Sequence, residues 1–308
     1  MQPIILVHGG AGDIPQSRVQ GKLDGVKVAV GKGYQVFKKG GTALEAVEAA
    51  VVSMEDDPNF NAGYGSVLNV AGQVEMEASI MCGKDLDVGA VTLVKNFANP
   101  ISIALKVLSE SPHSLLGGEG AHIFALEKNF TTVPNESLIT QQAKDSLSRF
   151  LKHGEFGKTE IGDIDGSGVG TVGAVAIDSQ GHIAVATSTG GMSGKAVGRI
   201  GDTPQIGSGT YADDYIGGVS TTGHGESILK YCLAHSIIKL MENGLDSANA
   251  TKTAVEGMTK RLNNTAGAIT LSKDGEVGIH FSSNRMAWAY MKEDQITYGI
   301  ERGQILHD

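Results

Sequence analysis

Residues 170–173, Gly170-Thr171-Val172-Gly173, decide the fold because the character of the chain changes within them. Upstream, residues 154–170 (GEFGKTEIGDIDGSGVG) are polar and rich in glycine, with no helical or strand period. Downstream, residues 172–177 are small and apolar, which is typical of a buried strand. A lone threonine therefore lies where a linker meets a core strand. If the backbone were cut before it, Thr171 would carry a hydroxyl nucleophile and a free α-amine to serve as its base.

The strand after Thr171 is predicted to turn back on itself as a hairpin. Ser179-Gln180-Gly181 suits a three-residue hairpin loop whose last residue, a glycine, takes the left-handed conformation. That register pairs Asp178 with His182 and, counted back, Thr171 with Thr189. A second hydroxyl is therefore expected within reach of the Thr171 hydroxyl.

The half of the chain before the linker is predicted to hold both strands and helices. Thr42 and Glu45 form a capping box that begins one helix, and Asp56-Asp57-Pro58 ends it. Apolar and polar residues alternate from Val74 to Ile80, which indicates a half-buried strand. Further strands are expected at residues 4–7 and 90–94, and further helices at residues 23–39, 100–109, 120–128 and 136–151.

The half after the linker is predicted to continue from the hairpin into helices and then strands. One long amphipathic helix is expected to start near Glu226 and to run past Leu240, and a second to span residues 246–262. Strands are expected at residues 267–271, 277–281 and 287–291. Because strand pairs are separated from helix pairs, the order favours an α+β fold of antiparallel sheets covered by helices over a repeated βαβ winding.

Composition excludes several classes of function. The chain has 308 residues, enough to bury a full core, and its 25 basic and 34 acidic residues give a formal net charge of −9. That charge argues against a nucleic acid or an anionic membrane as a partner. No apolar run approaches the roughly 18 residues that span a bilayer, and Met1–Val7 lacks the basic region of a secretory signal. Cys82 and Cys232 have no metal or redox spacing and are expected to be buried thiols of a cytoplasmic protein.

Ser220-Thr-Thr-Gly-His-Gly-Glu226 leads directly into a predicted helix. Such a turn presents backbone N–H groups and a hydroxyl, which suit a developing oxyanion. Ordinary N-capping by Thr222 or Ser220 is the alternative interpretation. His224 is expected not to bind a metal, because no second His or Cys lies at ligand spacing.

Arg199 and Asp202 lie three residues apart among glycines. A guanidinium and a carboxylate so placed could hold the carboxylate and the ammonium of an amino acid. They could equally form a surface ion pair, which would contribute little to stability. The sequence alone leaves the two interpretations even.

His8-Gly-Gly-Ala-Gly12 follows a predicted strand and is superficially similar to a phosphate-binding loop. Pro15 breaks the Gly-x-Gly-x-x-Gly spacing and no Gly-Lys-Ser/Thr follows, so these glycines are expected to let backbone approach backbone in the core. A non-catalytic phosphate-binding protein is the alternative function from another class. It predicts indifference to Thr171→Ala.

The motifs together resemble those of the plant-type L-asparaginase/isoaspartyl peptidase family, the N-terminal threonine hydrolases that include aspartylglucosaminidase. The match covers nearly the whole chain in order, and the animal members of cytosolic type are especially similar. It runs through residues 8–12 (HGGAG), 60–63 (FNAG), 170–173 (GTVG), 188–191 (STGG), 198–202 (GRIGD) and 220–226 (STTGHGE).

The resemblance implies an αββα sandwich, the four-layer fold of the N-terminal nucleophile hydrolases, as a single domain over residues 1–308. It implies a precursor that cuts itself at Gly170–Thr171 into an α chain of residues 1–170 and a β chain of residues 171–308. Thr171 Oγ would attack the Gly170 carbonyl and give an ester that water opens. In the mature enzyme it would attack L-asparagine or a β-aspartyl dipeptide, with its freed amine as base and then acid.

The resemblance also assigns roles to the residues around Thr171. The Thr222 hydroxyl and the Gly223 N–H would form the oxyanion hole, Thr189 would orient and polarise the nucleophile, Arg199 would bind the substrate α-carboxylate, Asp202 would bind its α-ammonium, and Asn61 would support the Thr171 amine. Asparagine and β-aspartyl dipeptides present the same aspartyl moiety to this site, so the sequence does not rank them.

No catalytic cofactor is implied, but the loop from Met54 to Tyr64 resembles the family's sodium-binding loop. Its ligands would be the backbone carbonyls of Met54, Glu55, Asp57, Phe60, Ala62 and Tyr64. Family members are typically homodimers of the cleaved αβ unit. The alternative within the same fold is a glycosylasparaginase; the intact His8–Gly12 segment and the lack of a secretory signal count against it, since that relative is lysosomal.

Overall fold

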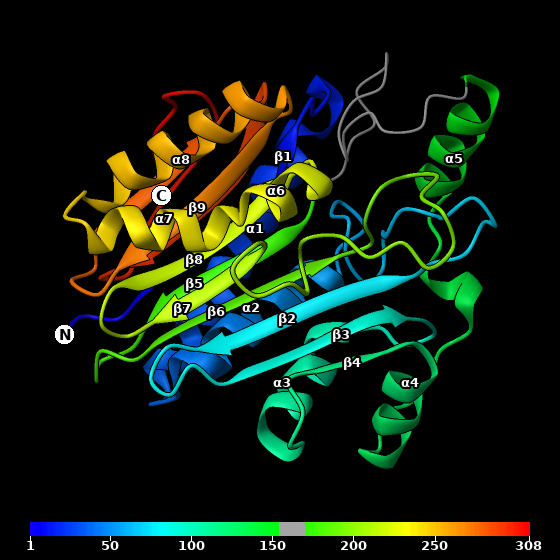
Figure 1. Ribbon diagram of the computed structural model, residues 1–308, viewed down its shortest axis with the longest axis horizontal. Coiled ribbons are helices and arrows are strands. Elements are labelled where there is room, and N and C mark those ends of the chain that lie inside the picture. Colours follow the sequence, from blue (N-terminus) through cyan, green and yellow to red (C-terminus); the bar gives the residue numbers. More distant parts are fainter. Residues whose placement is uncertain (154–169) are drawn as a thin grey trace.

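The computed structural model describes residues 1–153 and 170–308, in which helices and strands form a mixed α/β assembly (Figure 1). Of the predicted linker, only Gly170 lies within the described residues. The strands are β1 (Ile4–Gly12), β2 (Met76–Cys82), β3 (Val88–Val94), β4 (Leu115–Gly117), β5 (Val172–Ile177), β6 (Ile183–Thr189), β7 (Thr210–Asp213), β8 (Gly217–Gly223), β9 (Ala266–Ser272), β10 (Val277–Phe281), β11 (Arg285–Lys292), β12 (Gln295–Glu301) and β13 (Leu306–His307). The helices are α1 (Gln16–Lys38), α2 (Ala43–Glu55), α3 (Pro100–Glu110), α4 (Gly118–Glu127), α5 (Gln141–His153), α6 (Gly225–Tyr231), α7 (Leu233–Glu242) and α8 (Ser247–Leu262), with a 3-10 turn at Asn135–Leu138.

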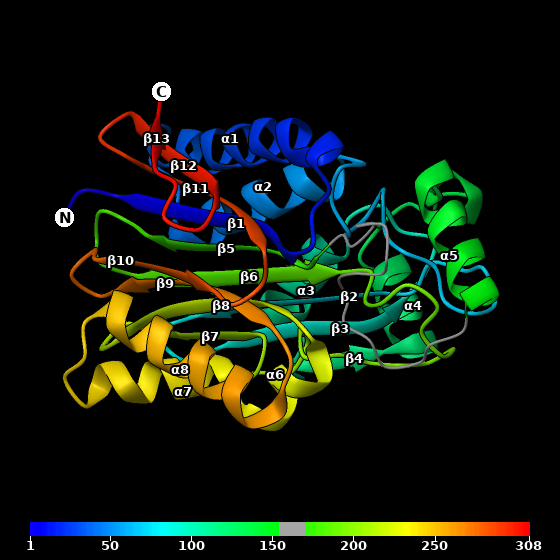
Figure 2. The same ribbon diagram turned by 90° about the horizontal axis from the view of Figure 1, so that it is seen from above.

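The strands form two sheets that pack face to face (Figure 2). A nine-stranded sheet has the order β13-β12-β11-β1-β5-β6-β2-β3-β4, and a four-stranded sheet has the order β10-β9-β8-β7. The pairings are antiparallel, as expected, except that β3 and β4 are parallel because α3 carries the chain across between them. Within the described ranges, no helix is long and apolar enough to cross a bilayer.

Helices cover the outer face of each sheet. α1, α2 and α3 pack on the nine-stranded sheet, and α7 and α8 pack on the four-stranded sheet. In β1, Ile5 and Val7 enter the core beneath the helices, whereas Ile4 and Leu6 enter the core between the sheets. Burial of both faces explains why this strand is a continuous apolar run and not an alternating one.

The hairpin formed by β5 and β6 confirms the register predicted from the sequence. Val172 pairs with Ser188 and Ile177 with Ile183, and the same count sets Thr171 opposite Thr189. Gly181 closes the loop with a φ of +87°, the left-handed conformation that the prediction required. The capping box of Thr42 and Glu45 is likewise confirmed at the start of α2.

The prediction that the strand near residues 74–80 is half-buried was wrong. β2 begins at Met76, and its polar residues Glu77 and Ser79 are fully buried. The face of β2 that carries these polar residues packs against β7 of the four-stranded sheet and against the loop that precedes β7. In that loop, the Thr203 carbonyl accepts a hydrogen bond from Ser79. Because this sheet is covered on both faces, alternation of apolar and polar residues does not indicate a solvent-exposed face here.

The single helix predicted from Glu226 was also wrong. Cys232 adopts a φ of +50° and separates α6 from α7. The chain restarts there because the N–H groups of Ala234 and His235 donate to carbonyls of the turn at residues 207–208 instead of continuing the first helix. Cys232 is exposed and Cys82 only half-buried, so the expectation of two buried thiols was wrong as well.

Other boundaries differ from the prediction for local reasons. α1 begins at Gln16, directly after Pro15, and so extends well before the predicted start. The helix predicted over residues 136–151 divides into the 3-10 turn and α5, because Thr140 accepts a hydrogen bond from the Ala143 N–H and caps a new helix. The strand around Ala287–Met291 exists, but it joins β1 in the large sheet.

Candidate active site

Thr171 lies at the start of β5 with its side chain fully buried. Its hydroxyl donates a hydrogen bond to Thr189 Oγ1, 3.1 Å away, and Thr189 Oγ1 also accepts the Gly191 N–H at 3.0 Å. Because that N–H fixes the Thr189 oxygen, the Thr171 hydroxyl has a defined direction. In the uncut chain the Thr171 nitrogen is an amide, so it carries no lone pair to serve as a base.

The peptide before Thr171 lies against the strand that carries the first glycine motif. Gly10 has a φ of +97°, and a Cβ on it would lie 2.7 Å from the carbonyl carbon of Gly170. A Cβ on Gly170 would lie 2.8 Å from the Gly10 Cα and 3.0 Å from Thr222 Oγ1. Both glycines are therefore needed for backbone to approach backbone here, as the sequence predicted for residues 8–12. The Thr222 hydroxyl is thereby placed beside the Gly170 peptide.

Thr222 and Gly223 are the last residues of β8, so the interpretation of Ser220 or Thr222 as an ordinary N-cap was wrong. His224 occupies the cap position and its side chain makes no capping bond. Gly223 has a φ of +134°, and a Cβ on it would lie 2.6 Å from the Ala266 Cα. The Thr222 hydroxyl at this strand end thus lies beside Gly170, and Gly223 follows it directly in the chain.

Arg199 is held by Glu226, a residue that the sequence analysis gave no separate role. Its Nε and Nη2 each donate to one Glu226 carboxylate oxygen at 3.0 Å. Asp202 is almost fully buried, so a surface ion pair of Arg199 with Asp202 does not describe this arrangement. Burial raises the pKa of Asp202 to about 7, and the charge of Arg199 opposes that rise. The partly buried guanidinium of Arg199 therefore acts electrostatically on the buried carboxylate of Asp202.

The loop that carries Arg199 and Asp202 is fixed by buried charges that sequence reasoning missed. The Glu77 carboxylate accepts the Gly201 N–H at 3.0 Å. Lys195 Nζ donates to the Glu75 carbonyl at 2.7 Å and lies 4.0 Å from Glu77. Burial raises the pKa of Glu77, while Lys195 and Arg199 oppose that rise. Two glutamates at positions 75 and 77 of a strand could have indicated a buried charged cluster, but the alternating pattern led to the prediction that both face solvent.

Lys22 is a second buried charge that the sequence analysis missed, since it precedes the predicted start of its helix. Its Nζ donates to the Gly9 carbonyl at 2.6 Å and lies 4.8 Å from the centroid of the Phe60 ring. Burial lowers the pKa of Lys22 well below its ordinary value. Lys22 thus holds the strand segment that presses Gly10 against Gly170.

Asn61 lies beside the turn that follows β6. Its Nδ2 donates to the Gly191 carbonyl at 2.7 Å and its Oδ1 accepts the Val67 N–H at 3.0 Å. In the uncut chain these bonds support the turn next to Thr189 and are distinct from the role expected for Asn61 at the Thr171 amine.

The loop expected to bind sodium folds tightly back onto the end of α2. The carbonyls of Met54, Glu55 and Asp57 each accept one backbone N–H. A carbonyl oxygen has two lone pairs, so these three groups fit a cation site as well as their own turn. Glu55 Oε2 is buried without a hydrogen-bond partner in this structure, and burial raises the Glu55 pKa to about 8. In residues 1–153 and 170–308, no cluster of three or more His, Cys, Asp or Glu side chains could hold a metal.

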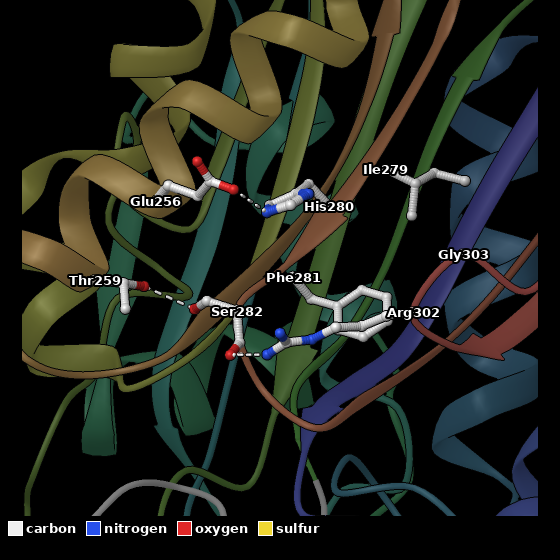
Figure 3. Close-up of a pocket in the computed structure, with 8 residues that line it drawn as sticks. All are labelled: Glu256, Thr259, Ile279, His280, Phe281, Ser282, Arg302 and Gly303. Atoms are coloured by element: carbon white, nitrogen blue, oxygen red, sulfur yellow. Dashed lines mark hydrogen bonds and ion pairs between the residues drawn. The ribbon is translucent and has the colours of Figure 1, made fainter.

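A cavity of about 420 Å³ lies elsewhere, between α8, β10 and the turn after β12 (Figure 3). His280 lies 3.4 Å from Glu256 on one side of it, and Arg302 donates to the carbonyls of Ser282 and Ser283 on the other. None of the predicted site residues lines this cavity. The cavity is therefore separate from the group around Thr171.

Comparisons with known proteins agree with this geometry. A family model described as asparaginase matches residues 1–300. A probable isoaspartyl peptidase/L-asparaginase of Drosophila pseudoobscura pseudoobscura is 49% identical over 320 residues, which cover 99% of this chain and 98% of the relative. The isoaspartyl peptidase/L-asparaginase of Xenopus laevis is 48% identical over 304 residues, covering 99% and 97%, and that of Homo sapiens is 45% identical over 302 residues, covering 98% and 97%. With the motif residues gathered around one buried threonine, the chain belongs to the asparaginase family.

Proposed function

We propose that this protein is an autoprocessing threonine hydrolase that converts L-asparagine to L-aspartate and ammonia and hydrolyses β-aspartyl dipeptides. The observation that carries the proposal is the hydrogen bond from the Thr171 hydroxyl to Thr189, directly beside the Gly170 peptide. The names of the relatives, which cover almost the whole chain, support the same substrates.

Self-cleavage is the first step of the proposed reaction. Thr171 Oγ attacks the Gly170 carbonyl carbon, its proton passes to the leaving nitrogen, and the peptide bond becomes an ester. That step already frees the Thr171 amine; water then opens the ester, which releases the carboxylate of residue 170 and restores the Thr171 hydroxyl. Gly170 has no Cβ to obstruct attack on its carbonyl. A Cβ at this position would also meet the Thr222 hydroxyl.

Hydrolysis of the substrate repeats this chemistry with the freed amine as the base. An α-amine titrates near pH 7.7–8.0, so it can accept the Thr171 hydroxyl proton at neutral pH and pass it to the leaving group. Thr171 Oγ forms an ester with the β-carbonyl of the substrate and releases ammonia or an amino acid. Water completes the cycle. The Thr222 hydroxyl and the Gly223 N–H stabilise the negative charge on the carbonyl oxygen.

Substrate recognition rests on Arg199 for the α-carboxylate and on Asp202 for the α-ammonium. Glu226 fixes the plane of the guanidinium through two hydrogen bonds, so Arg199 meets the substrate in one orientation. Both proposed substrates present the same aspartyl group and differ only in the leaving group.

The protonation of Asp202 predicts how activity depends on pH. With a pKa raised to about 7, Asp202 loses its charge as the pH falls below that value, and the substrate ammonium loses its partner. We expect protonation of Asp202 to lower kcat/KM for L-asparagine by up to about tenfold per pH unit below neutrality, in addition to the fall caused by protonation of the Thr171 amine, because kcat/KM reports groups of the free enzyme. A pH profile of the purified enzyme measures this fall. Asp202→Asn should have a low kcat/KM at every pH and should lack the part of the acid-side fall that is due to Asp202. If the pH profile of kcat/KM in Asp202→Asn has the same shape as in the original enzyme, Asp202 does not bind the substrate ammonium.

We further propose that the arrangement of the layers is the αββα sandwich of the N-terminal nucleophile hydrolases, in a single domain over residues 1–308. The cleaved chains, residues 1–170 and 171–308, would stay together and form a homodimer in the cytoplasm. A solution mass corresponding to one 32.0 kDa unit would contradict the dimer.

A structural sodium ion is proposed for the loop from Met54 to Tyr64, held by backbone carbonyls. A cation that binds only the folded state stabilises that state, so replacing sodium chloride by choline chloride at equal ionic strength should lower the thermal midpoint. Equal midpoints in the two salts would rule out a sodium ion that matters for stability.

The proposed function is tested by offering three substrates to the purified protein. L-Asparagine should yield aspartate and ammonia, and β-Asp-Leu should yield aspartate and leucine. Turnover of a glycosylated asparagine in preference to both would favour the glycosylasparaginase alternative. No turnover of any substrate by fully cleaved protein would leave the phosphate-binding alternative.

A further inference from the structure

One step below the reacting groups lies a layer of buried polar side chains that the proposed mechanism does not use. Strand residues two apart have side chains on the same face, so Thr187 lies below Thr189 and Ser220 below Thr222. We name as the buried polar layer the five residues that are fully buried at this level: His8, Ser79, Thr187, Thr210 and Ser220.

The layer is made of two rows that face each other across the sheets. In the nine-stranded sheet, His8 pairs with Gly173, Gly173 with Thr187, and Thr187 with Ser79. In the four-stranded sheet, Ser220 pairs with Thr210. The strand registers alone thus bring one imidazole and four hydroxyls to the same level of the interface between the sheets.

Hydrogen bonds between the two rows join the sheets. His8 Nε2 lies 2.9 Å from Ser220 Oγ, and Ser220 Oγ lies 2.8 Å from Thr187 Oγ1. Thr210 Oγ1 donates to Thr187 Oγ1 at 2.7 Å and lies 2.8 Å from Ser79 Oγ. Every bond in this set runs from a strand of one sheet to a strand of the other.

The hydroxyls of this layer each contact more than one polar partner. Besides the bond from Thr210, Thr187 Oγ1 lies within hydrogen-bonding distance of Ser220 Oγ and of the Gly209 carbonyl, and Ser220 Oγ in turn lies within reach of His8 Nε2. Burial lowers the pKa of His8 to about 3, so the imidazole is neutral and has one N–H to give. Removing any one hydroxyl of the buried polar layer would leave a buried donor or acceptor without its partner.

Gly173 has a specific reason to be glycine in this arrangement. A Cβ on Gly173 would collide with Ser220 Oγ and would lie 2.5 Å from His8 Nε2. The bond from His8 to Ser220 therefore passes over β5 only because residue 173 has no side chain. The last glycine of the Gly170–Gly173 motif is thus part of the same arrangement.

The position of this layer bears on catalysis because the proposed site is divided between the sheets. Thr171 and Thr189 belong to strands of the nine-stranded sheet, whereas Thr222 and Gly223 end a strand of the four-stranded sheet. The distance between nucleophile and oxyanion donors therefore depends on how one sheet sits on the other. Apolar contacts have no preferred direction, so those around the layer do not determine how far one sheet is shifted along the other. Hydrogen bonds are directional and therefore do.

We propose that Thr187 and Ser220 are positioning residues whose hydrogen bonds across the sheets set the nucleophile at the correct distance from the oxyanion donors. The inference rests on the proposed function and adds to it residues that touch neither the substrate nor the reacting atoms. A misplacement of about 1 Å can cost a factor of 100 in rate, so a lost positioning bond should lower kcat and spare substrate binding.

The test compares Thr187→Val, which removes the hydroxyl and keeps the shape, with Thr187→Ser, which keeps the hydroxyl. Thr251→Val is the matched control, because Thr251 Oγ1 donates to Thr270 Oγ1 at 2.7 Å in an equally buried pair between α8 and β9. For each variant, kcat and KM for L-asparagine are measured per cleaved αβ unit, together with the rate of self-cleavage and the thermal midpoint.

Thr187→Val is expected to lower kcat by about 10- to 100-fold with KM within about twofold of the original, and to slow self-cleavage as well. Thr187→Ser should restore most of the lost rate, and Thr251→Val should lower only the thermal midpoint. If Thr187→Val loses no more kcat than Thr251→Val, or if KM alone changes, the inference is wrong.

Ser220→Ala is the second variant, should Thr187→Val fold poorly, and the same split between kcat and KM is expected of it. If both variants fail to fold while Thr251→Val folds, the layer is a scaffold only and the positioning role is refuted. Thr171→Ala is assayed in parallel. If Thr171→Ala still hydrolyses asparagine, the proposed function fails, whatever the Thr187 variants do.

Discussion

Replacing Thr171 with alanine is expected to give a chain that neither cuts itself nor hydrolyses asparagine. The substitution removes the oxygen that attacks the carbonyl in both self-cleavage and hydrolysis, and it leaves the buried contacts of the neighbouring strand in place. Loss of a catalytic nucleophile costs on the order of 10⁴- to 10⁶-fold in kcat. A denaturing gel reports the cleavage, and ammonia release reports the hydrolysis.

The informative control is Thr171→Ser, which retains a hydroxyl at the same position. It should still cut itself and hydrolyse substrate, more slowly, because serine lacks the methyl group that helps to fix the rotamer of threonine. Undiminished ammonia release by purified Thr171→Ala would remove the basis of the mechanism.

Replacing Arg199 with methionine is expected to weaken the use of both substrates without stopping self-cleavage. The substrate α-carboxylate would lose its charged partner, and truncating one member of a buried, hydrogen-bonded charge pair costs about 2–5 kcal/mol, roughly 30-fold or more in kcat/KM. Self-cleavage should continue because it engages the Gly170 carbonyl and not a substrate carboxylate. Steady-state kinetics on the cleaved variant measures the loss.

Two comparisons make the Arg199 result specific. Arg261→Met removes the same charge from an exposed position at the end of α8 and should leave kcat/KM unchanged. In Arg199→Met, kcat/KM should fall by the same factor for asparagine and for β-Asp-Leu, since both substrates present the same aspartyl moiety. A loss confined to one substrate, or a block in self-cleavage, would contradict the role given to Arg199.

The features that could be predicted from sequence are those set by residues near one another in the chain. The hairpin register that sets Thr171 opposite Thr189 follows from one three-residue loop with a left-handed glycine. The capping box at Thr42 depends on a spacing of three residues. Each is decided by local backbone chemistry, and the structure confirms both.

The features that could not be predicted depend on contacts distant in the chain. Glu77 is on the buried face of β2 only because a second sheet covers it, and Cys232 breaks a helix only because the turn at residues 207–208 accepts the next N–H groups. Lys22 is buried because α1 lies over the Gly9 carbonyl. None of these partners is adjacent in sequence, so periodicity alone assigned Glu77 and Cys232 to the wrong environment and gave Lys22 none.

The candidate site was predicted mainly through its motifs. Thr171, Thr189, Thr222, Arg199 and Asp202 all lie in stretches that resemble the family, and the structure gathers their strands and loop at one end of the two sheets. The groups that hold these residues in place carry no motif of their own. The pairing of Glu226 with Arg199 and the buried polar layer emerge only from the register of strands in two sheets.

The central claim is that Thr171 acts on substrate only after the bond before it is cut, and one time course tests it most directly. Purified precursor is incubated, and intact mass with N-terminal sequencing gives the cleaved fraction while ammonia release from L-asparagine is followed in the same samples. We expect a new N-terminus at Thr171, fragments of residues 1–170 and 171–308, and a hydrolysis rate proportional to the cleaved fraction. A chain that stays whole and yet hydrolyses asparagine at the full rate would contradict the account.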